Sequence, residues 1–135
     1  MATEVGHGDG VHEILEHRPD TVAVARGTAQ RLLENWQVSR DCVEAVVLVV
    51  SELVTNAIEH ALPPVVLHLR QDCDDRVWVG VSDGGPAMHA GPWTASCADD
   101  EHGRGLKIVA ALAETHGTHT HSAGTTTHWA RIITG

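Results

Sequence analysis

Phenylalanine and tyrosine are absent from this chain, so its core must be built from aliphatic side chains, with four tryptophans as large fillers. Cysteine is also scarce. Cys42, Cys73 and Cys97 are odd in number and far apart, which fits neither a disulfide framework nor a CxxC metal site. We expect these three residues to be reduced and to have a structural role.

Basic residues are few. The sequence has 9 Lys and Arg against 18 Asp and Glu, which gives a formal net charge of −9. This balance argues against a general affinity for nucleic acid or for an anionic membrane surface. An anionic ligand would therefore have to be held by local donors.

The chain also lacks an apolar run of the ~20 residues that a membrane helix needs, and residues 1–10 lack the basic and apolar regions of a signal peptide. We expect a cytoplasmic protein that does not contact a membrane. Its 135 residues fit one domain. We predict a flexible lead-in over residues 1–10 and a single domain over residues 11–135.

Hydrophobic periodicity predicts an α+β fold. The segment 40–61 is rich in β-branched residues, but without Gly or Pro it is too long for a typical strand of about 5–6 residues, so we predict a buried helix. The order of elements favours a two-layer sandwich, with a mixed, mostly antiparallel sheet and helices on one face. The predicted helices are 21–36, 40–61 and 105–116, and the predicted strands are 11–17, 65–70, 76–83, 118–122 and 125–134.

A polar stripe lies on the predicted buried helix. Glu52, Asn56 and His60 are spaced by four residues and would share one edge of the helix. Because the preceding segment is strongly apolar, polar groups on its continuation need a reason, and a ligand is the simplest one.

Two glycine-rich segments add to this stripe. In the strand 76–83, the alternating core valines end in Asp83, which is followed by Gly84 and Gly85. These glycines allow a sharp turn and the close approach of a planar ligand. The second segment is Gly103-Arg104-Gly105-Leu106, which enters a helix whose free N–H groups favour phosphate; Arg104 and Lys107 add positive charge there. Residues 86–104 would form a lid loop.

In these motifs the chain resembles the ATP-binding proteins of the gyrase, Hsp90, histidine kinase and MutL (GHKL) superfamily, which have the two-layer Bergerat fold. It is most similar to bacterial anti-sigma factor serine/threonine kinases. Residues 52–57 resemble the N box of that family, residues 83–85 its first glycine box, and residues 103–106 its second. The resemblance extends in order over about residues 19–133.

The resemblance implies a role for each matching residue. Asn56 would coordinate the Mg²⁺ that bridges the nucleotide phosphates, and Asp83 would accept a hydrogen bond from the adenine 6-amino group. Thr127 would support that adenine contact, directly or through water, and Gly85 would leave room for the base. Glu52 would be the general base that orients a hydroxyl for attack on the γ-phosphate.

For the remaining motif residues, the resemblance implies contacts to phosphate. Residues 103–106, which are Gly103, Arg104, Gly105 and Leu106, would belong to the lid that wraps the phosphates, and Lys107 would add positive charge there. His60 would lie near them in a role that the resemblance does not define. The implied cofactors are ATP and Mg²⁺.

The resemblance also implies protein partners, namely a sigma factor, an anti-sigma factor antagonist or both, and a homodimer. Two functions stay open: a kinase that transfers the γ-phosphate of ATP to Ser or Thr of a partner, and a non-catalytic ATP- or ADP-binding signalling module. A third, remote hypothesis is a metal site among the histidines near the C-terminus. Those histidines are His116, His119, His121 and His128.

Overall fold

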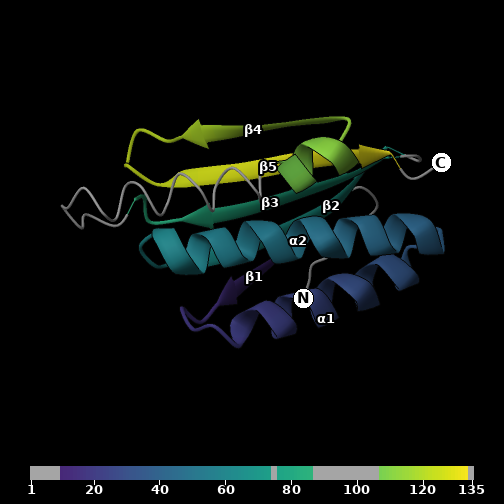
Figure 1. Cartoon of the computed structure of the whole chain (residues 1–135), viewed down its shortest axis with the longest axis horizontal. Helices are drawn as coiled ribbons and strands as arrows, with labels where there is room; N and C mark the ends of the chain where they lie inside the picture. The colour runs from purple at the N-terminus through teal and green to yellow at the C-terminus, as the bar shows by residue number, and fades with distance from the viewer. Residues whose placement is uncertain (1–9, 74–75, 87–106, 134–135) are drawn as a thin grey trace.

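Two long helices lie on one face of a five-stranded antiparallel sheet (Figure 1). The computed structural model describes residues 10–73, 76–86 and 107–133. The strand order is β1-β2-β3-β5-β4, and every neighbouring pair is antiparallel. The predicted α+β two-layer sandwich is therefore confirmed. The elements are β1 (Val11–Leu15), α1 (Thr21–Asn35), α2 (Arg40–His60), β2 (Val65–Cys73), β3 (Arg76–Asp83), β4 (Thr115–Thr120) and β5 (Thr126–Ile133).

Helix α2 is the central element of the helical layer. It packs against β2, β3 and β5, while α1 packs on α2. The Ser39 hydroxyl caps its N-terminus by accepting a hydrogen bond from the Cys42 N–H at 3.3 Å, with Asp41 in the first turn. Five of its eight buried residues are valines, and four of these five are 0% exposed. Burial of this face thus outweighs the strand preference of β-branched residues, as the length of the segment predicts.

Strand β3 supplies the core from the sheet side. Val77, Val79 and Val81 are fully buried, and Asp83 continues the same face at 3% exposure. The prediction that this strand ends in a carboxylate directed toward the core is therefore confirmed. In the part of the chain that the structure describes, no helix is long and apolar enough to cross a membrane.

The predicted helix over residues 105–116 is too long at its C-terminus. The observed helix covers residues 107–112, and Thr115 already belongs to β4. The Glu114 N–H donates to the Arg131 carbonyl at 2.8 Å, and Gly117 lies so close to the Trp129 indole that a Cβ there would be 3.0 Å from the ring. Pairing with β5 therefore replaces the last helical turn.

Smaller differences concern the ends of strands. Strand β1 ends at Leu15, and β2 continues to Cys73, past the Arg70 boundary that alternation predicts. The register between β2 and β3 shifts between Gln71 and Cys73, so an irregular pairing extends into the segment between the two predicted strands. At the other end of the chain, β4 ends at Thr120 rather than at residue 122.

We predict that Leu33→Ala lowers the free energy of unfolding by about 2–5 kcal/mol, because Leu33 of α1 is 0% exposed and its loss leaves a cavity in the core. The matched control is Leu48→Ala, since Leu48 is 43% exposed. Urea unfolding followed by tryptophan fluorescence measures both. Equal destabilisation by the two variants would contradict the assigned core.

Candidate functional site

A cavity of about 360 Å³ lies between the last turns of α2 and the neighbouring ends of β3, β4 and β5. Three residues predicted from the sequence, Asn56, His60 and Asp83, line this cavity together. Two members of the polar stripe therefore meet Asp83 of the first glycine box in space. The other described residues that line it are Ala61, Pro86, Thr120, Thr126 and His128.

The backbone after α2 is tied directly to the backbone after β3. The Leu62 N–H donates to the Gly85 carbonyl at 2.8 Å, and the Gly84 N–H donates to the Leu62 carbonyl at 2.6 Å. Ala61 and Pro86 form a β-bridge beside them. A Cβ on Gly84 would be 2.3 Å from the Pro63 carbonyl oxygen, so this close approach requires glycine. These contacts bring the end of α2 next to Asp83.

Asp83 is the buried carboxylate of the cavity. Its Oδ1 accepts a hydrogen bond from the Gly85 N–H at 2.8 Å, and its Oδ2 lies 3.8 Å from His128 Nε2. Burial raises the pKa of Asp83, while the Gly85 N–H and His128 oppose that rise. One carboxylate oxygen is thus fixed by its own turn, and the other is directed toward His128.

Gly85 has a backbone conformation that side chains rarely adopt. Its φ is +101°, and a Cβ there would be 2.7 Å from the Gly124 carbonyl oxygen. Glycine at this position therefore allows the turn that supplies the N–H to Asp83. The sequence predicts a sharp turn at this glycine, and the structure adds the hydrogen bond from its N–H to Asp83.

His128 was not predicted to belong to this site. It lies on β5, with Nδ1 3.1 Å from the Thr118 hydroxyl oxygen and a side chain that is 19% exposed. Burial lowers the pKa of His128, whereas the nearby Asp83 carboxylate raises it. Strand alternation is the sequence pattern that indicates an inward-facing His128, because it shares a face with the apolar residues Ala130 and Ile132.

The structure separates Thr127 from Asp83, contrary to the expectation from the resemblance. The Thr127 hydroxyl is 2.9 Å from the Ser82 hydroxyl and 2.9 Å from His121 Nε2, on the face of the sheet away from α2. Thr126 is the residue that pairs with Asp83 and lines the cavity. A difference of one residue changes the face of a strand, so Thr126 and not Thr127 lies beside Asp83 in this cavity.

The other predicted site residues lie elsewhere or are not described. Glu52 is half-buried on α2, one helical turn before Asn56, and it is not among the described residues that line the cavity. Lys107 is exposed and is the first described residue of the helix that covers residues 107–112. Gly103, Arg104, Gly105 and Leu106 lie outside the described residues, as does the predicted lid loop apart from Pro86.

The histidines proposed as metal ligands are divided between two places. The rings of His119 and His121 meet edge to face with centroids 4.5 Å apart, whereas His128 lies in the cavity with Asp83. Within residues 10–73, 76–86 and 107–133, there is no group of three His, Cys, Asp or Glu residues that could hold a metal ion.

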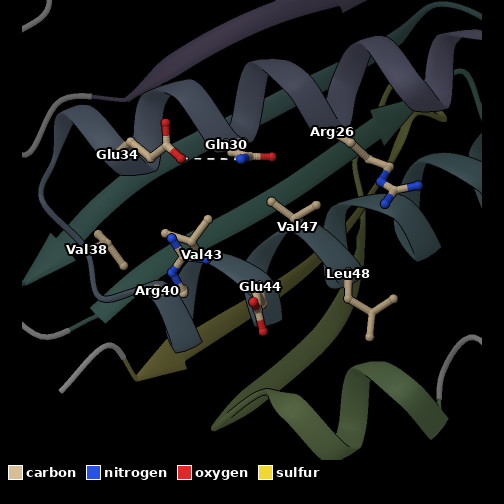
Figure 2. Close-up of a pocket in the computed structure, with 9 residues that line it drawn as sticks. All are labelled: Arg26, Gln30, Glu34, Val38, Arg40, Val43, Glu44, Val47 and Leu48. Carbon is tan, nitrogen blue, oxygen red and sulfur yellow. Dashed lines mark hydrogen bonds between the residues drawn. The ribbon is translucent and has the colours of Figure 1, made fainter.

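A larger cavity of about 630 Å³ lies between α1 and α2 (Figure 2). Arg26, Gln30 and Glu34 reach it from α1, and Gln30 donates a hydrogen bond to Glu34 at 3.3 Å. It contains none of the residues predicted for the functional site. We assign the candidate site to the smaller cavity, because a buried carboxylate and an amide converge there.

Comparison with known proteins identifies the family of the chain. A family profile described as a histidine kinase-like ATPase domain matches residues 15–130. The chain belongs to this family. ATP is the ligand that membership implies, and the predicted GHKL resemblance is confirmed. A search among curated proteins finds no match.

Two solved structures share the fold of this ATPase domain. The RsbU and RsbW domains of Rv1364c from Mycobacterium tuberculosis match with a TM-score of 0.70 and 21% identity, over 93% of this chain and 32% of that chain. This ATPase domain thus spans about a third of the Rv1364c chain. The SiaB–SiaC complex from Pseudomonas aeruginosa matches with a TM-score of 0.59 and 11% identity, over 91% of this chain and 89% of that chain.

We predict that Gly85→Ala destabilises this ATPase domain by about 1–3 kcal/mol, because alanine is strained at this φ and its Cβ would contact the Gly124 carbonyl. The matched control is Gly27→Ala, where the nearest atom is an Arg31 nitrogen at 3.5 Å within α1. That helix position should be stabilised by about 0.5–1 kcal/mol. Thermal unfolding compares the two, and a neutral Gly85→Ala would contradict the assigned turn.

Proposed function

We propose that the chain binds Mg-ATP between α2 and the ends of β3 and β5, and that it transfers the γ-phosphate to a Ser or Thr of a partner protein. The observation that carries this proposal is the convergence of Asn56 and Asp83 in one cavity, in a chain that belongs to a family of ATPase domains. An alternative function is a signalling module that binds ATP or ADP without transfer.

Asp83 is proposed to select the base. Its Oδ2 would accept the adenine 6-amino group, while Oδ1 stays bonded to Gly85. The Thr126 hydroxyl would support this contact, because Thr126 is paired with Asp83 and is only 8% exposed. Gly85 would let the base approach the backbone.

Asn56 is proposed as the protein ligand of Mg²⁺. Its amide lines the cavity one helical turn from His60, and an amide oxygen suits this hard cation, which usually keeps several waters and phosphate oxygens. When bound, the ion would offset the negative charge of the phosphates. This matters for a chain with a net charge of −9. Lys107 and the segment Gly103-Arg104-Gly105-Leu106 would supply further phosphate contacts, with His60 beside them.

Glu52 is proposed as the general base for transfer. It would accept the proton of the attacking Ser or Thr hydroxyl as that oxygen bonds to the γ-phosphorus and ADP leaves. One observation favours the non-catalytic alternative: Glu52 is not among the described residues that line the cavity. Transfer therefore requires that the bound partner place its hydroxyl near the preceding turn of α2.

The partner is proposed to be a small anti-sigma factor antagonist that carries the accepting hydroxyl, with a sigma factor as the sequestered protein. Support comes from two structural relatives whose names describe RsbW and a SiaB–SiaC complex. The second name refers to assembly with a protein partner. The homodimer and the cytoplasmic location expected from the sequence are part of the same proposal.

We predict that Asp83→Asn weakens ATP binding by roughly 10- to 150-fold, because the variant loses a charged acceptor for the 6-amino group. Titration calorimetry with ATP and GTP, with and without Mg²⁺, measures the loss. The control is Asp20→Asn, an exposed carboxylate that bonds to Arg18. Equal binding of ATP and GTP by the wild-type protein would contradict the proposed site.

We predict that Glu52→Gln reduces phosphoryl transfer by about 100-fold or more and leaves ATP affinity within about threefold, because a general base acts in the transition state. Transfer from γ-labelled ATP to a candidate antagonist measures the rate. Glu59→Gln is the control, since Glu59 is on the same helix with a side chain that is 51% exposed. Unchanged transfer in Glu52→Gln would rule out its role as the base, and absence of transfer by wild type would favour the non-catalytic module.

A further inference from the structure

Two polar atoms of the cavity face each other at a distance beyond that of a direct hydrogen bond. Asp83 Oδ2 and His128 Nε2 are 3.8 Å apart, which is longer than a hydrogen bond. Asp83 is 3% exposed, and the His128 side chain is 19% exposed, so both groups are largely removed from water. A ligand that enters the cavity can bond to both atoms at once, because they lie side by side on its wall.

The surroundings of His128 determine which ring nitrogen carries the proton. A carboxylate oxygen only accepts hydrogen bonds, so a proton on Nε2 is favoured opposite Asp83 Oδ2. Nδ1 is then an acceptor, and the Thr118 hydroxyl, 3.1 Å away, can donate to it. Burial lowers the pKa of His128 and so favours the neutral ring, while the nearby Asp83 carboxylate opposes that shift. His128 therefore presents an N–H donor beside the acceptor of Asp83.

We propose that His128 and Asp83 together recognise the hydrogen-bonding edge of adenine: Asp83 Oδ2 accepts from the 6-amino group, and His128 Nε2–H donates to N1. This inference rests on the proposed nucleotide site and extends it to a specificity-determining residue. Adenine presents a donor and an acceptor side by side at this edge. Guanine presents them in reverse order, with the 6-oxo acceptor opposite the carboxylate and N1–H opposite the imidazole N–H.

Asp83 and His128 make different contributions to the recognition of adenine. Asp83 alone distinguishes an amino group from an oxo group at position 6. His128 adds a requirement for an acceptor at N1, and a ligand without it would leave the Nε2–H buried and unpaired. The test therefore uses 1-deaza-ATP, which keeps the 6-amino group but has C–H in place of N1.

Titration calorimetry with ATP and 1-deaza-ATP on the full chain makes the comparison. We expect the wild-type protein to bind 1-deaza-ATP roughly 10- to 100-fold more weakly than ATP. His128→Leu should weaken ATP binding and bind the two ligands within about threefold of each other, because it lacks the donor. His128→Gln should keep the preference, since its amide N–H can take the place of Nε2–H. His116→Leu is the control, because His116 is an exposed histidine on β4.

Equal affinity of the wild-type protein for ATP and 1-deaza-ATP would overturn this inference and leave the proposed ATP site intact. Persistence of the preference in His128→Leu would also overturn it, because another group would then contact N1. If the wild-type protein bound neither ligand, the proposed function itself would be wrong. The comparison of two ligands on the wild-type protein does not depend on the folding of any variant.

Discussion

The candidate site depends on one short set of backbone hydrogen bonds between two connections that are far apart in the sequence. Leu62, just after α2, exchanges bonds with Gly84 and Gly85, just after β3. This link holds the end of the polar stripe beside Asp83, and the Gly85 N–H orients the carboxylate. Because a Cβ on either glycine would collide with a backbone oxygen, the motif Asp-Gly-Gly is a steric requirement as well as a binding signal.

Strand alternation then divides the polar residues of the sheet between two faces. Asp83 and His128 face α2, whereas Ser82 and Thr127 face away and bond to each other. On that outer face the chain of contacts continues from Ser82 to His68, whose pKa falls to about 4 because of burial and the nearby His12 and Arg70. Asp83 and His128 are sequence neighbours of Ser82 and Thr127, but the two pairs lie on opposite faces of the sheet.

The sequence predicts the two layers of the fold and the positions of Asn56 and Asp83 in the site, because these features follow from hydrophobic periodicity. The valine-rich helix and the alternation that ends in Asp83 are examples. The sequence has three consecutive threonines, Thr125 to Thr127, and periodicity does not show which of them lies beside Asp83. That position depends on the register of β5 against β3, which pairs Asp83 with Thr126. The end of the helix before β4 was also missed, because the contact between Gly117 and Trp129 joins different strands.

A crystal structure of the protein with Mg²⁺ and a non-hydrolysable ATP analogue would test the central claim most directly. The account predicts the adenine 6-amino group within hydrogen-bonding distance of Asp83 Oδ2, with the phosphates on the side of Asn56. A nucleotide bound in the cavity between α1 and α2, or an adenine without contact to Asp83, would contradict it.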